Sequence, residues 1–394
     1  MGPIADRRLL PSWTAVLPLG GCWRTPFDQR GYLQRMKAHH LALLAIVVAA
    51  CNVSKTLDRS NNKTFGANGL EQRVFLDQDG PRFTWATKDL GKSGKPVLLL
   101  VHGITSSNAM WAGNLGTLSQ HFDLIVPDLI GHGRSTSVWS GNSVDAQVAH
   151  LVMILDSLGA RMPVHVVGNS YGGAMAANMA EQHPHRVRSL VIYDGPASDY
   201  TSAMADSVAR SVGAADITDL FSPENPDEQY RLLSMAMYEP PKVPRFALKQ
   251  MYERYGAQRA QHLALLQDLL KNEDMYAAKQ YQWSMPVHVI WGEGDRLIPK
   301  ATGMGIAERN GLPTDHLILV PKAGHVANVE QKEVFEGHLL RILADGPCPD
   351  PSKKSDGPCT LDYDPYCGCD GMTYSNRCAA WRAGVRLVGR GACK

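Results

Sequence analysis

Short apolar runs alternate with segments of helical periodicity through residues 95–343, and this alternation restricts the possible folds more than any other feature of the chain. Six stretches contain such a run and finish at a glycine or a polar residue: Lys95–Gly103, His121–Ser135, Met162–Gly168, Arg186–Gly195, Met285–Asp295 and Asp315–His325. Helical segments lie between them, for example Ser143–Gly159, which has cap signals at both ends. Strands that alternate with helices predict an α/β fold with a doubly wound, mostly parallel sheet.

Polar residues gather where these predicted strands end, which is where parallel sheets carry their functional loops. Ser170, in "VVGNSYGG", stands between a predicted strand and a helix rich in small residues. A sharp turn from strand to helix pushes a serine hydroxyl out of the sheet, and the start of the helix adds positive potential beside it. The sequence therefore predicts that Ser170 is a nucleophile.

A serine hydroxyl is a weak nucleophile at neutral pH and needs a base, which in turn needs an orienting acid. His325 follows the last predicted strand in "AGH", and Asp295 follows the strand before it in "GEGD". We therefore predict a catalytic triad of Ser170, Asp295 and His325, with each residue at the carboxyl end of a strand.

Residues from about 71 to 343 resemble an α/β-hydrolase in the motifs "VHGITSSNAMW", "VPDLIGHGRS", "GNSYGG", "VIWGEGDRLIP" and "AGH". The resemblance implies acylation of Ser170 with His325 as base, followed by attack of water on the acyl-enzyme. It also implies an oxyanion hole formed by the backbone N–H groups of Ile104 and Tyr171. The HGGG pattern of many lipases is replaced by a shorter His-Gly-x form. The resemblance implies no cofactor and no metal.

Four other residues at these strand ends are alternative candidates. Asp194, in "IYDGP", is the second candidate for the acid, since some members of the family place it there. Asp128 is interpreted as an organiser of the "GHGRS" loop, and His102 and His132 as residues that hold loop shape.

The insert at about 196–284 lies where this family carries a cap, and it is rich in Met, Leu, Phe and Tyr. Most of these side chains pack the cap onto the core, but a cap of this composition favours an apolar acyl group. The insert and "GNSYGG" most resemble the monoacylglycerol-lipase-like branch of esterases. A Gly-Asn-Ser-x-Gly-Gly pattern also occurs in carbon–carbon bond hydrolases, which remain an alternative function.

Six of the eight cysteines crowd the end of the chain, and none lies between Cys51 and Cys348. Six cysteines in so short a region indicate three disulfides and an oxidising compartment. Zinc is the alternative interpretation, but Cys367-Gly-Cys369 lacks the two-residue spacing typical of zinc ligands.

Residues from about 348 to 393 resemble a Kazal-type serine protease inhibitor in the cysteine spacing and "DGMTYSN". The resemblance implies a rigid reactive loop with Leu361 as the residue that enters a subtilisin-, chymotrypsin- or elastase-like pocket, followed by Asp362. It also implies that Asn376 braces the loop. The family pairing gives Cys359–Cys378 and Cys367–Cys393, which leaves Cys348 with Cys369. The family's fifth cysteine is missing, so a stapled module without inhibitory activity is an alternative. Another is an inhibitor displayed on a catalytically idle hydrolase scaffold.

The region before the hydrolase resembles a bacterial lipoprotein signal. We expect translation to begin at Met36, because the charge of Lys37 and an apolar run up to "VAAC" follow it. Residues 1–50 would be the signal region, with cleavage before Cys51 and lipidation of that residue. This predicts a lipoprotein anchored to a membrane of the bacterial cell envelope, on its periplasmic or extracellular face.

The remaining expectations concern domain limits and partners. The polar segment 51–69 predicts a flexible tether, residues 70–344 the hydrolase, and residues 345–394 the Kazal-like domain. The formal net charge is +2 and no basic block is present, so we expect no nucleic-acid partner. The expected partners are a lipid or small ester substrate, a membrane and a serine protease.

Overall fold

The computed structural model describes residues 53–77, 80–135, 143–343, 349, 354–368, 370–385 and 387–393. The predicted signal region, the lipidation of Cys51 and the Cys348–Cys369 pairing fall outside these residues. Within the described ranges, no helix combines the length and the apolar character needed to cross a membrane.

The core is an eight-stranded sheet in the order β1-β2-β4-β3-β5-β6-β7-β8. Its strands are β1 (Leu70–Asp77), β2 (Gly80–Thr87), β3 (Val97–Val101), β4 (Asp123–Pro127), β5 (Val164–Asn169), β6 (Val187–Tyr193), β7 (Val287–Gly292) and β8 (Leu317–Val320). β2 is antiparallel to both β1 and β4, and every pairing from β4 to β8 is parallel. The predicted mostly parallel α/β fold is therefore confirmed, with two antiparallel edge strands that we did not predict.

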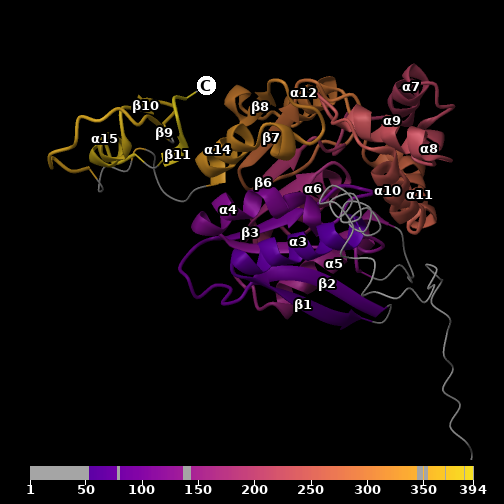
Figure 1. Ribbon diagram of the computed structural model, residues 1–394, viewed down its shortest axis with the longest axis horizontal. Coiled ribbons are helices and arrows are strands. Elements are labelled where there is room, and N and C mark those ends of the chain that lie inside the picture. The colour runs from indigo at the N-terminus through magenta and orange to yellow at the C-terminus, as the bar shows by residue number, and fades with distance from the viewer. Residues whose placement is uncertain are drawn as a thin grey trace, which may run out of the picture. The chain divides into compact units, whose positions relative to one another are not determined.

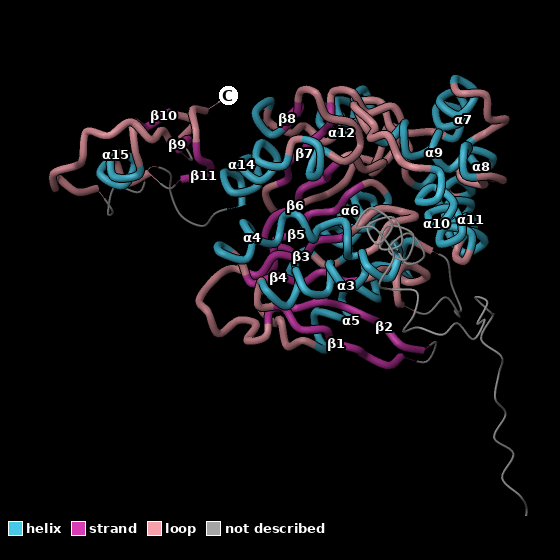
Figure 2. The backbone as a smooth tube through the Cα atoms, viewed as in Figure 1, coloured by secondary structure: helices cyan, strands magenta, loops and turns pink. Residues whose placement is uncertain are grey.

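Side chains of the central strands alternate between two packed faces, as a sheet covered on both sides requires. Leu99 and Val101 of β3 pack in one cluster with α5, α6 and α12, whereas Leu98 and Leu100 pack in another with η1, α4 and α14. Figure 2 shows the strands lying side by side with helices around them. These helices are η1 (Asn108–Asn114), α4 (Leu115–His121), α5 (Val144–Ser157), α6 (Tyr171–Gln182), α12 (Lys300–Arg309), α13 (Ala327–Glu330) and α14 (Lys332–Leu343), with short turns η2 (Pro184–Arg186) and η4 (Thr314–His316).

The insert between β6 and β7 folds into a helical cap, whose helices α7 to α11 lie together in Figure 1. Its elements are α7 (Ser202–Ser211), α8 (Ile217–Leu220), α9 (Pro226–Ala236), α10 (Arg245–Gly256), α11 (Arg259–Lys271) and η3 (Glu273–Met275). Local sequence explains the start of α9, because the Asn225 side chain accepts hydrogen bonds from the N–H groups of Asp227 and Glu228, and Pro226 stands at the first helical position.

The segment predicted to be a flexible tether is instead the helix α3 (Val53–Ala67), so that prediction was wrong. Phe65 is buried and its ring lies 4.9 Å from that of Trp85 on β2. Asp58 forms an ion pair with Arg254 of α10, with Oδ1 and Nη1 2.8 Å apart. A short polar helix is marginal on its own, and here contacts with distant parts of the chain stabilise it. Its local composition gave no sign of them.

The C-terminal domain contains β9 (Tyr366–Gly368), β10 (Thr373–Tyr374), α15 (Arg377–Arg382) and β11 (Leu387–Arg390), with the strand order β10-β9-β11. Disulfides join Cys359 to Cys378 and Cys367 to Cys393, which is the pairing that the resemblance implies. These four sulfurs are therefore not available as zinc ligands.

Candidate active site

Ser170 occupies a sharp turn between β5 and α6, with φ at 54°, a backbone conformation that residues other than glycine rarely adopt. Its N–H donates to the carbonyl of Tyr193 at 2.9 Å, and the side chain is largely buried. Two residues later, a Cβ on Gly172 would lie 2.4 Å from the His102 carbonyl oxygen. Glycine at that position therefore lets the turn approach the loop after β3.

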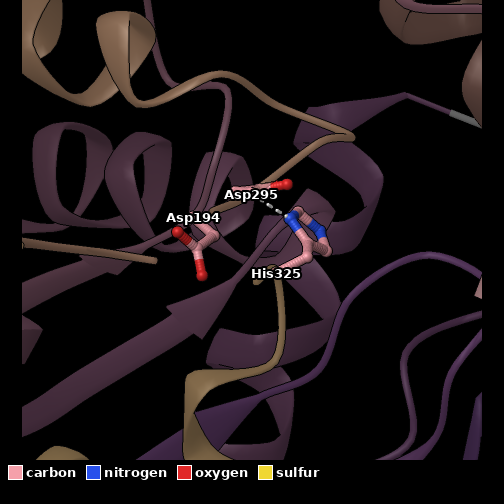
Figure 3. A group of neighbouring side chains, drawn as sticks. All are labelled: Asp194, Asp295 and His325. Atoms are coloured by element: carbon pink, nitrogen blue, oxygen red, sulfur yellow. Dashed lines mark hydrogen bonds and ion pairs between the residues drawn. The ribbon is translucent and has the colours of Figure 1, made fainter. Parts of the chain in front are cut away.

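His325 and Asp295 form the closest polar contact of the site, with Nδ1 and Oδ2 2.7 Å apart (Figure 3). The other oxygen of Asp295, Oδ1, accepts hydrogen bonds from the N–H groups of Leu297 and Ile298 at 2.8 and 3.0 Å. Both oxygens of Asp295 are thus engaged, and the imidazole donates Nδ1–H to one of them. This arrangement leaves Nε2 of His325 as the nitrogen that can accept a proton.

Contacts from the cap and the core hold the loop that carries His325. The His325 N–H donates to the carbonyl of Ala236 at the end of α9, at 2.9 Å. The Asn169 side chain, next to Ser170, donates to the His325 carbonyl at 3.2 Å. Arg296, next to Asp295, donates to the carbonyls of Ser234 and Met237. The positions of the acid and the base therefore depend on the cap as well as on the sheet.

Asp194, the alternative acid, lies beside this pair but makes no hydrogen bond to His325 (Figure 3). Its Oδ1 accepts from the Gly292 N–H at 2.8 Å, while its buried Oδ2 has no partner among the described residues. Burial, followed by the nearby charge of Asp295, raises the pKa of Asp194 well above its usual value. A neutral carboxyl cannot orient an imidazolium as an anion does, so the geometry favours Asp295 as the acid.

Asp194, Asp295 and His325 are also the described residues that could together hold a metal ion, since one ligand atom from each lies within 4.8 Å of the others. The hydrogen bonds of Asp295 compete with that role, because two backbone donors and His325 already use its oxygens.

The predicted oxyanion hole lies next to the nucleophile. Ile104 and Tyr171 line the same cavity as Ser170 and His325, and a Cβ on Gly103 would lie 2.9 Å from the Ser170 Cβ. His102 fixes this loop, because its Nδ1 donates to the Gly103 carbonyl at 2.8 Å and its Nε2 accepts from the Leu129 N–H at 3.0 Å. Burial lowers the pKa of His102 to about 4, so this imidazole is neutral at neutral pH.

Asp128 and His132 shape the neighbouring loop, as we predicted. Asp128 accepts from the N–H groups of Asn108 and Arg134 at 2.8 and 3.0 Å, and burial raises its pKa to about 6. His132 is buried, with Nδ1 3.0 Å from the Ile130 carbonyl oxygen. Their bonds stay within the loop and its neighbours.

A cavity bounded by the cap opens onto Ser170 and His325 and holds about 740 Å³ of space free of protein atoms, part of it continuous with solvent. Its walls come from the core loops and from α7, α8 and α11, with apolar residues such as Phe221, Leu266 and Leu270. Among the described residues, Glu273 is the charged acid of this lining, and no Lys or Arg belongs to it. The sequence did not indicate Glu273, because nothing local places it near Ser170.

The predicted reactive loop of the C-terminal domain has the opposite exposure. Leu361 is fully exposed, at 100%. Asn376, which is buried, donates from Nδ2 to the carbonyls of Thr360 and Asp362 at 2.9 and 3.0 Å. The same side chain accepts from the Ala379 N–H and caps α15. One amide therefore bridges the residues on both sides of Leu361 and joins them to the helix that carries Cys378.

This strand order, with a tight nucleophile turn after β5, is that of a capped hydrolase, and residues 96–332 match the family model described as alpha/beta hydrolase fold. The chain belongs to the alpha/beta hydrolase fold family. Residues 348–393 match the model of the Kazal-type serine protease inhibitor domain.

Individual relatives include lipases. The chain is 28% identical over 265 residues to Lipase 3 of Moraxella sp. (strain TA144), covering 66% of this chain and 81% of that protein. It is 24% identical over 296 residues to the monoacylglycerol lipase ABHD6 of Homo sapiens, covering 73% and 86%. Among solved structures, the 2-hydroxy-6-oxo-6-phenylhexa-2,4-dienoate hydrolase of Rhodococcus sp. strain RHA1 superposes with a TM-score of 0.58 at 18% identity, covering 69% and 97%. That last likeness concerns the fold.

Proposed function

We propose that this protein is a serine hydrolase that cleaves carboxylic esters with an apolar acyl group, of the lipase or monoacylglycerol-lipase type. The observation that carries the proposal is the apolar cavity under the cap, which Ser170 and His325 both line, together with the Asp295–His325 hydrogen bond. The lipases among its relatives support the same class of substrate.

In this mechanism His325 accepts the proton of Ser170 through Nε2 as the serine oxygen attacks the ester carbonyl. Asp295 keeps the imidazole in the required tautomer and stabilises the imidazolium that forms. The backbone N–H groups of Ile104 and Tyr171 stabilise the oxyanion, aided by the N-terminus of α6. His325 then protonates the leaving alcohol, and water activated by the same base releases the acid from Ser170.

Hydrolysis of a carbon–carbon bond is the second candidate. The substrate in the name of the Rhodococcus enzyme is a dienoate, which carries a carboxylate. The cavity described above offers no Lys or Arg to bind such an anion and places a carboxylate of its own there. This electrostatic mismatch favours the ester over the carboxylate-bearing ketone.

We also propose that the C-terminal domain inhibits a subtilisin-, chymotrypsin- or elastase-like protease through Leu361 and the following Asp362. A loop already held in one conformation loses little entropy on binding, which favours tight binding. We further propose that lipidation of Cys51 anchors the protein to a membrane of the bacterial cell envelope, where an esterase of this kind would meet lipid substrates.

The test uses the protein from Asn52 onward, with nitrophenyl esters of increasing acyl length beside a dienone ring-cleavage product. We expect turnover of the esters, a preference for the longer apolar chains, and a loss of about 10³-fold or more in Ser170→Ala. The same variant should still titrate the protease at full strength. Turnover of the dienone alone would contradict the ester assignment, and ester hydrolysis retained by Ser170→Ala would contradict the assignment of the nucleophile. Absence of any turnover together with intact protease binding would indicate an inhibitor on an idle scaffold.

A further inference from the structure

One wall of the cavity is acidic where the rest is apolar. Glu273 of η3 lines the cavity and accepts two hydrogen bonds from Ser202, one from its N–H at 2.5 Å and one from its hydroxyl group. Ser202 is the first residue of α7, after the N-cap Thr201, and both of these residues also line the cavity. Residues 71 positions apart thus join at the entrance of the cap helices.

Glu273 is negatively charged at neutral pH. Its hydrogen bonds from the Ser202 hydroxyl and N–H lower the pKa of its carboxyl group. Its Oε2 takes part in both bonds, and its Oε1 has no bond to a described residue among those found. One oxygen of the carboxylate therefore remains able to interact with a substrate.

Cations near this region are already paired with other acids. The Lys279 ammonium lies 2.6 Å from a carboxylate oxygen of Glu181. The Arg309 guanidinium makes two hydrogen bonds to Asp199, at 2.5 and 2.7 Å. Within the described part of the chain no basic side chain lines the cavity, so the field there is that of an uncompensated carboxylate.

We propose that Glu273 selects substrates by charge, so that the enzyme hydrolyses esters without a negative group in preference to esters that carry a phosphate or carboxylate. The inference rests on the proposed ester hydrolysis and names its substrate class as neutral acylglycerol-like esters. An anionic headgroup in the cavity meets a like charge in surroundings that are poor in water, where repulsion is stronger than in bulk solvent. A hydroxyl-bearing neutral headgroup can instead donate a hydrogen bond to the free oxygen.

A purely structural role for Glu273, as an acceptor at the start of α7, is separable from the role in charge selection. In Glu273→Gln the amide oxygen still accepts from Ser202, so the link between η3 and α7 is kept while the charge is lost. Glu224→Gln is the matched control, because Glu224 is an exposed carboxylate of the cap that does not line the cavity. Both substitutions change the net charge equally.

The experiment measures kcat/KM of the protein from Asn52 onward on 1-hexanoylglycerol and 1-hexanoylglycerol 3-phosphate, two soluble esters with the same acyl group. We expect the wild type to prefer the neutral ester by about tenfold or more. Glu273→Gln should shrink that ratio by about tenfold, through faster turnover of the phosphate ester, and added salt should shrink it in the wild type only. Glu224→Gln should keep the wild-type ratio.

A ratio unchanged by Glu273→Gln, or changed to the same degree by Glu224→Gln, would overturn the charge selection while leaving ester hydrolysis intact. A wild type that prefers the phosphate ester would do the same. Failure to hydrolyse either ester, in a protein that also leaves nitrophenyl esters intact, would overturn the proposed function and this inference with it.

Discussion

The two reactive segments of this chain, the turn at Ser170 and the loop at Leu361, are both held in fixed conformations by different means. Ser170 is 8% exposed and Leu361 is 100% exposed. Packing of backbone against backbone holds Ser170, as the close approach of Gly172 to the His102 carbonyl shows. Around Leu361, the Asn376 amide and the Cys359–Cys378 disulfide hold the loop.

This difference follows from domain size. A sheet of eight strands covered on both faces has enough core to keep a strained, buried turn in place. A domain of about 50 residues buries too little apolar surface for that and depends on covalent links and a few polar contacts. We therefore expect the buried site to be sensitive to lost charges and to acid, and the exposed loop to be sensitive to the loss of single hydrogen bonds.

The largest effect is expected where the buried site depends on one anion. Asp295→Ala should lower kcat/KM for esters by about 10⁴-fold, because His325 loses the acceptor that fixes its tautomer. Asp194→Asn should lower it by less than about tenfold, since the Asp194 carboxyl is already neutral and bonds to Gly292 rather than His325. Steady-state kinetics on one nitrophenyl ester measures both, and circular dichroism checks their folding.

The reverse order, with Asp194→Asn the more damaging of the two, would show that Asp194 is the working acid. Protease inhibition should be unchanged in both variants, because the reactive loop takes no part in the site.

Sequence patterns identified the parts of the molecule that depend on local rules. Strand, turn and helix follow one another around Ser170, so its backbone position could be inferred from neighbouring residues alone. Asp295 and His325 could be inferred because the carboxyl ends of parallel strands meet at one edge of a sheet. The cysteine spacing likewise gave the two disulfides that the structure contains.

The features that sequence did not reveal are those that depend on contacts between distant segments. The helix α3 is polar and was interpreted as a tether, although Phe65 and Asp58 join it to β2 and α10. Glu273 is one of many acids in a charged cap, and its position in the cavity depends on how η3 and α7 pack. β1 and β2 were missed because an antiparallel edge pair follows no rule of strand and helix alternation.

Acid should separate the two regions by a smaller but still large effect. Burial lowers the pKa of His102 and of His262 to about 4, and that of His132 well below its usual value. The stability that these neutral imidazoles contribute is fully present above pH 6.5 and is lost as the pH falls towards 4, by up to about 3 kcal/mol for His262. Asp128 acts with the opposite sign, because its raised pKa of about 6 favours the folded state in acid.

The histidine effect is expected to dominate because three buried imidazoles act together, whereas residues 348–393 contain no histidine. Calorimetry of the full chain from pH 7.5 to pH 4.5 should show the transition of the hydrolase domain falling and that of the inhibitor domain staying in place. His262→Leu should reduce this fall, since both ring nitrogens of His262 are buried without partners in the described structure. Equal shifts of both transitions would contradict the assignment to the histidines.

The smallest effect is expected for the exposed loop, where Asn376 has two separable roles. Asn376→Asp keeps an oxygen that can accept from the Ala379 N–H and cap α15, but it cannot donate to the carbonyls of Thr360 and Asp362. Two lost hydrogen bonds amount to about 1–2 kcal/mol, which corresponds to roughly 10–30-fold weaker inhibition and faster cleavage after Leu361. Inhibition constants against subtilisin and the rate of loop cleavage measure this, and Asn376→Ala should add a loss of domain stability. An Asn376→Asp variant that inhibits as tightly as the wild type would show that the disulfides alone hold the loop.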